Sequence, residues 1–397
     1  MLIAHLADLH LGYRAYHRLA PGGINARERD VARAFRAALD RVIELRPELV
    51  LVAGDVFHTV RPSNSSIADA FRQFARLAAS LPEVPIVVIA GNHDSPRAVE
   101  TGSILRLLAE IPGVLVVDDA ARSLYLEPLD TAVLCLPHNA LTAGEVVAIE
   151  PDRAAATNIL MLHGTVAGGA AEQKLRYVSE YGGVKVETSE IKPEVWDYVA
   201  LGHYHIATEL APNMWYAGSV ERTSTNIWEE ATSEKGFVTF DTERRRGTFH
   251  PVPTRDVLDL PRFSARGLTP AEVDARIRAL VEEIPEGVKG KIVRLVVNDV
   301  TRELFRELDH RYIRELKAEA LHFHLDARRP EIRRVMGYGA PGRRRTLDEE
   351  VESFLKLHWQ PSSPEIDRDR LVALAERFMA EAAKGEVEDA LVDSREA

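Results

Sequence analysis

Residues 2–10 read LIAHLADLH, an apolar run that ends in Asp8 and His10. Four more apolar runs, bounded by Gly or Pro, end in turns that also carry Asp, Asn or His. The five turns are DLH at 8–10, GDVFH at 54–58, GNHD at 91–94, LHG at 162–164 and GHYH at 202–205. Short runs of Val, Ile and Leu predict buried strands. Because open α/β sheets bind ligands outside the carboxyl ends of their strands, we expect the five turns to meet at one sheet edge.

A single turn of this kind carries little weight. An Asp after a strand is often a helix cap, and a His-x-His pair is often a hydrogen-bonded structural pair. Here the same context recurs five times, and two Asp, one Asn and several His match a mixed oxygen and nitrogen shell for a borderline divalent metal. The repetition therefore predicts a metal site.

The order of these motifs, D-x-H, G-D-x-x-H, G-N-H-D, H and G-H-x-H, resembles the calcineurin-like metallophosphoesterase superfamily. Three segments narrow the resemblance to SbcD-type nuclease subunits of bacterial double-strand-break repair complexes and their archaeal and eukaryotic equivalents. They are HLADLHLGY at 5–13, GDVFH at 54–58 followed by RPS at 61–63, and YAGSVERT at 216–223. Beyond residue 250 the likeness is one of layout only.

The resemblance implies an α/β fold for residues 1–254, a two-sheet metallophosphoesterase sandwich flanked by helices, and we expect helices at 30–45 and 67–81. Residues 255–327 predict a small α+β unit with helices at 270–283 and 302–316 and strands at 291–297 and 321–325. In the family, a cap of this kind helps to choose the DNA. The composition of residues 328–345 predicts an Arg-rich linker. The pattern of residues 346–397 predicts a tail of C-terminal helices.

The resemblance also assigns the metal ligands. Asp55 is the expected bridge between two divalent ions. The first ion would also bind Asp8, His10 and His205, and the second would bind Asn92, His163 and His203. Manganese(II) is the expected metal, although the ligand types do not exclude iron or zinc.

Two further histidines are interpreted as catalysts. His93 suits a general acid, and we expect Asp94 to fix its tautomer. His58 is expected to contact the substrate phosphate. Serine/threonine phosphatases of the superfamily have an Asp-Arg pair where this chain has Phe57-His58, which favours the nuclease branch.

Other polar segments leave alternatives open. The loop at 13–29 either contacts a DNA backbone through Tyr16, His17 and Arg18 or is an ordinary surface loop. The Gly-rich segment at 164–183 is a candidate lid. The Arg-rich linker either follows phosphates or is a solvated hinge, and the two tail helices dock either on a partner or on the chain's own cap.

Composition agrees with a cytoplasmic enzyme. The chain of 397 residues has a single cysteine, Cys135, in an apolar run that predicts a buried strand, and it has no long uncharged apolar segment. The net charge of -11 argues only weakly against DNA binding, because residues 346–397 hold 14 acidic and 6 basic residues and so account for most of it.

Together these observations favour a two-metal DNA phosphodiester hydrolase, acting as a 3′-to-5′ exonuclease on duplex ends and as an endonuclease on single strands. The resemblance implies that the protein forms a homodimer and works with an SbcC-like coiled-coil ATPase. The C-terminal helices would bind that ATPase. The alternative is a stand-alone metallophosphodiesterase acting on a small nucleotide or another phosphodiester. A third interpretation is a scaffold whose site is unused.

Overall fold

The computed structural model describes residues 1–96, 102–143, 148–168 and 184–330, with isolated positions beyond residue 330. The chain divides into two compact units, Met1–Pro330 and Glu331–Ala397. Nearly all of the predicted linker and tail, and most of the predicted Gly-rich lid, therefore lie outside the described residues. Within the described part of the chain, no helix combines the length and apolar character needed to cross a membrane.

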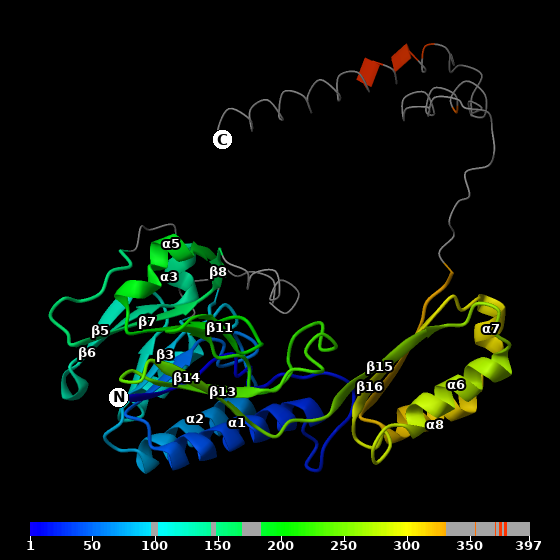
Figure 1. Cartoon of the computed structure of the whole chain (residues 1–397), viewed down its shortest axis with the longest axis horizontal. Coiled ribbons are helices and arrows are strands. Elements are labelled where there is room, and N and C mark those ends of the chain that lie inside the picture. The colour runs from blue at the N-terminus through cyan, green and yellow to red at the C-terminus, as the bar shows by residue number, and fades with distance from the viewer. Residues whose placement is uncertain are drawn as a thin grey trace. The chain divides into compact units, whose positions relative to one another are not determined.

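Two six-stranded sheets make up most of the first unit (Figure 1). In the first sheet, β1, β2, β3 and β4 are parallel neighbours, and β13 and β14 continue it on the other side of β1 in antiparallel pairing. The bounds are Leu2–Leu6 for β1, Leu49–Ala53 for β2, Ile86–Ile89 for β3, Val114–Val117 for β4, Gly236–Asp241 for β13 and Arg246–Pro251 for β14.

The second sheet also has a parallel centre. Strands β12, β10, β7 and β6 are parallel neighbours, and β11 and β5 pair antiparallel at the two edges. The bounds are Met214–Tyr216 for β12, Tyr198–Gly202 for β10, Thr157–His163 for β7, Thr131–Leu136 for β6, Thr208–Ala211 for β11 and Arg122–Leu126 for β5.

The two sheets stack on a shared apolar layer. Ile3 of β1 and Ala7, just after that strand, pack with residues of β6, β7 and β10, including the buried Cys135. Their neighbours Ala4 and Leu6 point to the opposite face, because successive side chains of a strand alternate. The arrangement confirms the predicted α/β two-sheet sandwich and the buried strand position of Cys135.

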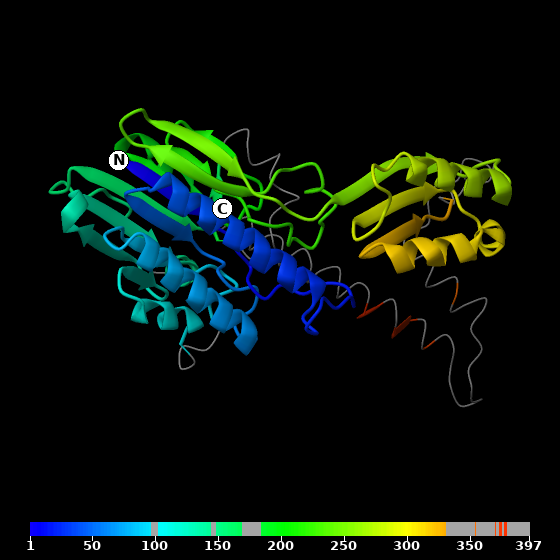
Figure 2. The ribbon, with the colours of Figure 1, turned by 90° about the horizontal axis from the view of Figure 1, so that it is seen from below.

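Two long helices cover the outer face of the first sheet, α1 (Ala26–Leu45) and α2 (Asn64–Ser80), and they lie side by side in Figure 2. The short helix η2 (Ile104–Glu110) packs with them. Both long helices begin earlier than predicted, because polar caps precede the apolar stripe. The Asn25 side chain accepts from the N–H groups of Arg27 and Glu28, and the Ser63 hydroxyl accepts from the N–H of Ser66.

Short elements cover the outer face of the second sheet, where Trp196 and Ile191 are buried. The remaining elements of this part are η3 (Glu127–Leu129), α3 (His138–Thr142), β8 (Thr165–Ala167), β9 (Lys185–Glu187), α5 (Thr188–Ile191) and η4 (Pro193–Val195). Strands β8 and β9 pair in a small sheet of their own.

Residues 255–327 contain a separate three-stranded parallel sheet. Its strands are β15 (Val257–Ser264), β16 (Ile292–Asn298) and β17 (His322–Ala327), and its helices are α6 (Pro270–Glu282), α7 (Arg302–Glu307) and α8 (His310–Glu319). This is the α+β composition that the sequence predicts for the segment. That the segment acts as a cap which helps to choose DNA stays a prediction.

The single helix predicted at 302–316 is wrong. The chain breaks at Leu308, whose backbone is extended and whose side chain is buried in the segment's core. Asp309 then caps α8 by accepting from the N–H of Tyr312, while its own N–H donates to the Asp274 carboxylate. The cap ends one helix and starts the next.

Candidate metal centre

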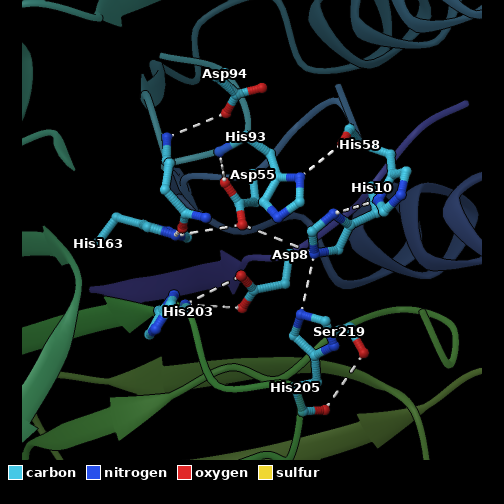
Figure 3. Close-up of polar contacts among 12 residues, drawn as sticks. Asp8, His10, Asp55, His58, His93, Asp94, His163, His203, His205 and Ser219 are labelled. Carbon is cyan, nitrogen blue, oxygen red and sulfur yellow. Dashed lines mark hydrogen bonds and ion pairs between the residues drawn. The ribbon is translucent and has the colours of Figure 1, made fainter. Parts of the chain in front are cut away.

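The turns that follow β1, β2, β3, β7 and β10 lie together at one end of the stacked sheets (Figure 3). The first two turns are joined by the backbone: the N–H of Asp8 donates to the Gly54 carbonyl over 3.0 Å, and the N–H of His10 donates to that of Asp55 over 2.9 Å. Asp8, His10 and Asp55 have φ values of 50°, 45° and 50°. Non-glycine residues adopt this conformation only where their surroundings hold it, and such positions are concentrated at functional sites.

The first group of potential ligands comprises Asp8, His10 and His205, all of them buried. Each offers one oxygen or nitrogen atom, and these atoms lie within 4.8 Å of one another. The Nε2 atoms of His10 and His205 face each other across 3.0 Å. This is the set that the resemblance assigns to the first ion, apart from the bridge.

The second group comprises Asp8, Asp55 and His163. One carboxylate oxygen of Asp55, Oδ2, lies 3.4 Å from Nε2 of His163 and 3.8 Å from Nε2 of His10. The Asp55 carboxylate therefore lies between histidines of both groups. A shared carboxylate in this place is what a pair of closely spaced cations requires.

Asn92 and His203 lie beside the second group. The side-chain oxygen of Asn92 is 3.1 Å from Nε2 of His163, and the rings of His163 and His203 have centroids 5.5 Å apart. The main-chain N–H of His203 donates to both oxygens of Asp8, over 3.0 and 3.1 Å. Nδ1 of His203 is buried and has no hydrogen-bond partner among the described residues.

A third group places both predicted catalysts next to a predicted ligand. His58 and His93 join His10, and the rings of His58 and His93 stack with centroids 5.2 Å apart. Nδ1 of His93 lies 2.6 Å from the main-chain carbonyl oxygen of His58. Since a carbonyl can only accept, Nδ1 carries a proton.

The expectation that Asp94 fixes the tautomer of His93 is wrong. The Asp94 carboxylate is buried and accepts from three main-chain N–H groups, those of Val56, Phe57 and Gly91, over 2.9 to 3.1 Å. The His58 carbonyl takes the place expected for Asp94 beside His93. Asp94 instead ties the second turn to the third.

The charges of the site depend on Asp55 and His163. Burial alone would raise the pKa of Asp55, but the charge of His163 holds it well below its ordinary value. Burial alone would lower the pKa of His163, but Asp55 raises it to about 9. Burial raises the pKa of Asp8 to about 6, and burial and the charge of His163 lower that of His203 to about 3. A proton on His163 thus occupies the position where a cation would balance the carboxylates.

The residues fit a divalent metal pair by their chemistry. Imidazole nitrogens, carboxylates and one amide oxygen converge from five separate turns, and a buried imidazole nitrogen without a partner costs free energy that a bound cation would remove. Neutral imidazoles and two carboxylates would leave the ions with residual positive charge for an anionic substrate.

The structure adds residues that the sequence analysis missed. His138 follows β6 as the other site histidines follow their strands, and its N–H donates to the carbonyl of Ala90 over 3.0 Å, next to the third turn. Burial and the charge of His163 lower its pKa. Its place after an apolar run was a usable signal. Glu230 and Lys235 are buried behind His205. Neither follows an apolar run, so the sequence offered no signal for them.

Two of the three substrate-binding candidates contact the 255–327 segment. The Tyr16 ring stacks on that of His322 at a centroid distance of 4.0 Å, and the Arg18 guanidinium donates to main-chain carbonyls at the end of α8. His17 is exposed. Arg27, in the first turn of α1, is fully buried against Asp30 and cannot reach DNA. Substrate binding by Tyr16, His17 and Arg18 stays a prediction.

Comparison with known proteins assigns the sequence to a family. The sequence model of the calcineurin-like phosphoesterase family matches residues 1–207. These residues include all five turns, the last of which, at 202–205, lies near the end of the matched range.

Several curated relatives are archaeal and carry the name DNA double-strand break repair protein Mre11. The chain is 26% identical to that of Methanocaldococcus jannaschii over 251 residues, 61% of this chain and 62% of the relative. It is 27% identical to that of Sulfolobus acidocaldarius over 209 residues, 52% and 50%, and 26% identical to that of Methanopyrus kandleri over 324 residues, 75% and 65%. Each match thus spans less than two thirds of the relative's length.

Proposed function

The chain belongs to the calcineurin-like phosphoesterase family, and from that premise we propose that it is a metal-dependent DNA nuclease of a double-strand-break repair complex. In finer terms, the proposal is a manganese-dependent 3′-to-5′ exonuclease on duplex ends that also cleaves single strands. The names of the archaeal relatives support the choice of DNA among the phosphodiesters that the family could cleave.

One observation carries the proposal. The carboxylate of Asp55 lies between His10 and His163, and each of these histidines belongs to a separate group of potential ligands. The first ion would be held by Asp8, His10 and His205, the second by Asn92, His163 and His203, with Asp55 between them. Two such ions, when bound, supply positive charge for the phosphoryl oxygens and lower the pKa of a water molecule.

The protein's own groups would move the protons and orient the phosphate. The His58 carbonyl holds the proton on Nδ1 of His93, so the imidazolium form of His93 would give its second proton, on Nε2, to the leaving oxygen of the cleaved strand and keep the one on Nδ1. His58 itself stacks against His93, in reach of the same phosphate. Both residues lie beside His10, an expected ligand, so the proposed proton donor would lie next to the proposed metal site.

The test is cleavage of an end-labelled DNA duplex by the purified protein in the presence of Mn(II). The wild-type protein is expected to shorten the strand from its 3′ end. His93→Leu is expected to lose this activity by at least the factor of about 10²–10⁴ that general acid catalysis contributes, while still binding two ions. His310→Leu, which makes the same change on α8 outside the three ligand groups, is the matched control and is expected to keep the activity.

Cleavage of a cyclic nucleotide with DNA left intact would instead favour the stand-alone phosphodiesterase. Full activity of His93→Leu on DNA would refute the role of His93. A wild-type protein without metal and without activity would favour the scaffold interpretation.

We also propose that the chain forms a homodimer and that its partner is a coiled-coil ATPase. The helices expected in residues 346–397 would bind this partner. Two tail positions that the structure describes, Leu374 and Phe378, have exposed apolar side chains. Apolar side chains of this size on a helix usually pack against another surface. Docking on the chain's own 255–327 segment is the competing arrangement, and loss of ATPase binding by Leu374→Glu/Phe378→Glu would decide for the partner.

A further inference from the structure

Behind the ligand group of the first ion lies a buried ion pair that the proposed chemistry does not use. Glu230 and Lys235 belong to the connection between β12 and β13, and they are 0% and 1% exposed. The Lys235 ammonium contacts one carboxylate oxygen of Glu230. Taking two charges out of water is unfavourable, and apolar residues of similar volume often stabilise a protein as well or better. A reason other than stability is needed for this pair.

Both members of the pair contact His205 (Figure 3 shows its ring and carbonyl). The second carboxylate oxygen of Glu230 lies 3.5 Å from Nδ1 of the His205 ring. The Lys235 ammonium donates to the His205 carbonyl over 2.6 Å and to the Ser219 hydroxyl over 3.1 Å. The N–H of Ser219 donates to the same carbonyl over 3.1 Å. The residue is thus held at its ring and at its backbone.

The opposite side of the ring faces the ligand group. Nε2 of His205 lies 3.0 Å from Nε2 of His10, within the group that includes Asp8. A carboxylate at Nδ1 selects the tautomer with the proton on that nitrogen, which leaves the lone pair on Nε2. Histidine ligands in metal sites usually have such a carboxylate partner, and its loss typically weakens metal binding 10- to 100-fold.

We propose that Glu230, with Lys235 as its counter-ion, is a positioning residue that fixes the tautomer and the orientation of His205 for the first ion. This inference rests on the proposed function, because it assumes that His205 is a ligand. It also gives a role to part of the YAGSVERT segment: Ser219 connects Lys235 to the His205 carbonyl.

The test replaces the pair without leaving a buried charge. Glu230→Met/Lys235→Met removes both charges at similar volume, and Glu230→Gln/Lys235→Met keeps a hydrogen-bond acceptor at position 230. The matched control is Arg27→Met/Glu221→Met, which removes another fully buried ion pair, 3.4 Å apart, that belongs to none of the ligand groups. Isothermal titration with Mn(II) gives the affinity and stoichiometry of both sites, and circular dichroism verifies folding.

We expect the Met pair to bind one ion 10- to 100-fold more weakly than the wild-type protein and the other ion unchanged. The Gln variant is expected to bind that ion with an affinity between those of the Met pair and the wild-type protein. The control pair is expected to bind both ions with wild-type affinity. If the Met pair does not fold, the weaker binding of one ion by the Gln variant tests the same point.

Unchanged affinity for both ions in the folded variants, or an equal loss in the control pair, would overturn the role of Glu230. A wild-type protein that bound no Mn(II) would overturn the proposed function as well. The two failures are therefore distinguishable.

Discussion

Asp55 is the residue on which the account of the site depends. Its carboxylate lies between His10 and His163, and its Oδ1 atom accepts from the N–H of His93 over 2.9 Å. A Cβ atom on Gly91 would lie 2.1 Å from that oxygen, so the neighbouring turn needs glycine. The turns that carry Asp55 and the other candidate ligands could be predicted because each follows an apolar run, and the family resemblance then assigned the ligands within them. The partners of Asp94 could not, because adjacency in sequence does not say which amides a carboxylate faces.

His5 gives a prediction about pH. Its ring is buried, with Nδ1 2.8 Å from the Tyr198 hydroxyl, and burial lowers its pKa from 6.5 to about 3 against the effect of a hydrogen bond at Leu201. A histidine with a lowered folded-state pKa stabilises the fold fully above pH 6.5, and the contribution is lost as the pH falls toward 3. We expect urea unfolding to show a loss of up to about 1.4 kcal/mol per pH unit in this range from His5 alone.

His5→Gln removes that contribution, so its free energy of unfolding should approach that of the wild-type protein as the pH falls from 7 to 4. Tyr198→Phe is the control, because it removes the hydroxyl but keeps the buried imidazole and should retain the wild-type pH dependence. Parallel curves for His5→Gln and the wild-type protein would contradict the prediction.

At the scale of elements, the site exists because two sheets approach each other closely at their ends. A Cβ atom on Gly202, the last residue of β10, would lie 1.8 Å from the Ala53 carbonyl oxygen, which ends β2. That same oxygen lies 2.8 Å from Nδ1 of His163. Glycine at position 202 therefore permits the contact that orients a candidate ligand.

Gly202→Ala is expected to destabilise the protein by about 3 kcal/mol, because the added Cβ would overlap the backbone carbonyl oxygen of Ala53. It should also weaken binding of the ion assigned to His163. Gly267→Ala, at a φ of 76° with no atom within 4 Å of the added carbon, should cost only about 1 kcal/mol for its backbone and leave metal binding intact. Thermal unfolding with and without Mn(II) measures both effects, and equal behaviour of the two variants would be inconsistent with the close approach.

Strands β1, β2, β3, β6, β7 and β10 could be predicted from their apolar runs, but the edge strands and the helix boundaries could not be predicted as well. Polar caps such as Asn25 extend α1 beyond its apolar stripe. Between α7 and α8, Leu308 continues the helical spacing in the sequence, yet its side chain enters the core from an extended backbone. These helix boundaries are set by tertiary packing, which the local sequence pattern does not encode.

Across the first unit, a group of charges joins the 255–327 segment to α1. The Arg255 guanidinium donates two hydrogen bonds to the Asp30 carboxylate, over 2.5 and 2.6 Å, and Asp30 is 7% exposed. Arg27 also donates to the Asp30 carboxylate, over 3.0 Å. No sequence motif predicts this link, because Arg255 and Asp30 lie more than two hundred positions apart in the chain.

Arg255→Met is expected to lower the free energy of unfolding by about 3 kcal/mol, since it removes one partner of a nearly buried carboxylate. It should also speed proteolysis in the connection before β15. Arg311→Met removes an exposed helical ion pair with Glu315 and should have little effect on either measurement. Equal protease resistance of Arg255→Met and the wild-type protein would show that the link is not needed.

The most direct test of the whole account is anomalous X-ray scattering from crystals of the wild-type protein grown with Mn(II). We expect two peaks about 3.5 to 4 Å apart on either side of the Asp55 carboxylate, one beside His10 and His205 and the other beside His163 and His203. No peak among these residues, or a single peak elsewhere on the protein, would contradict the assignment of a two-metal centre.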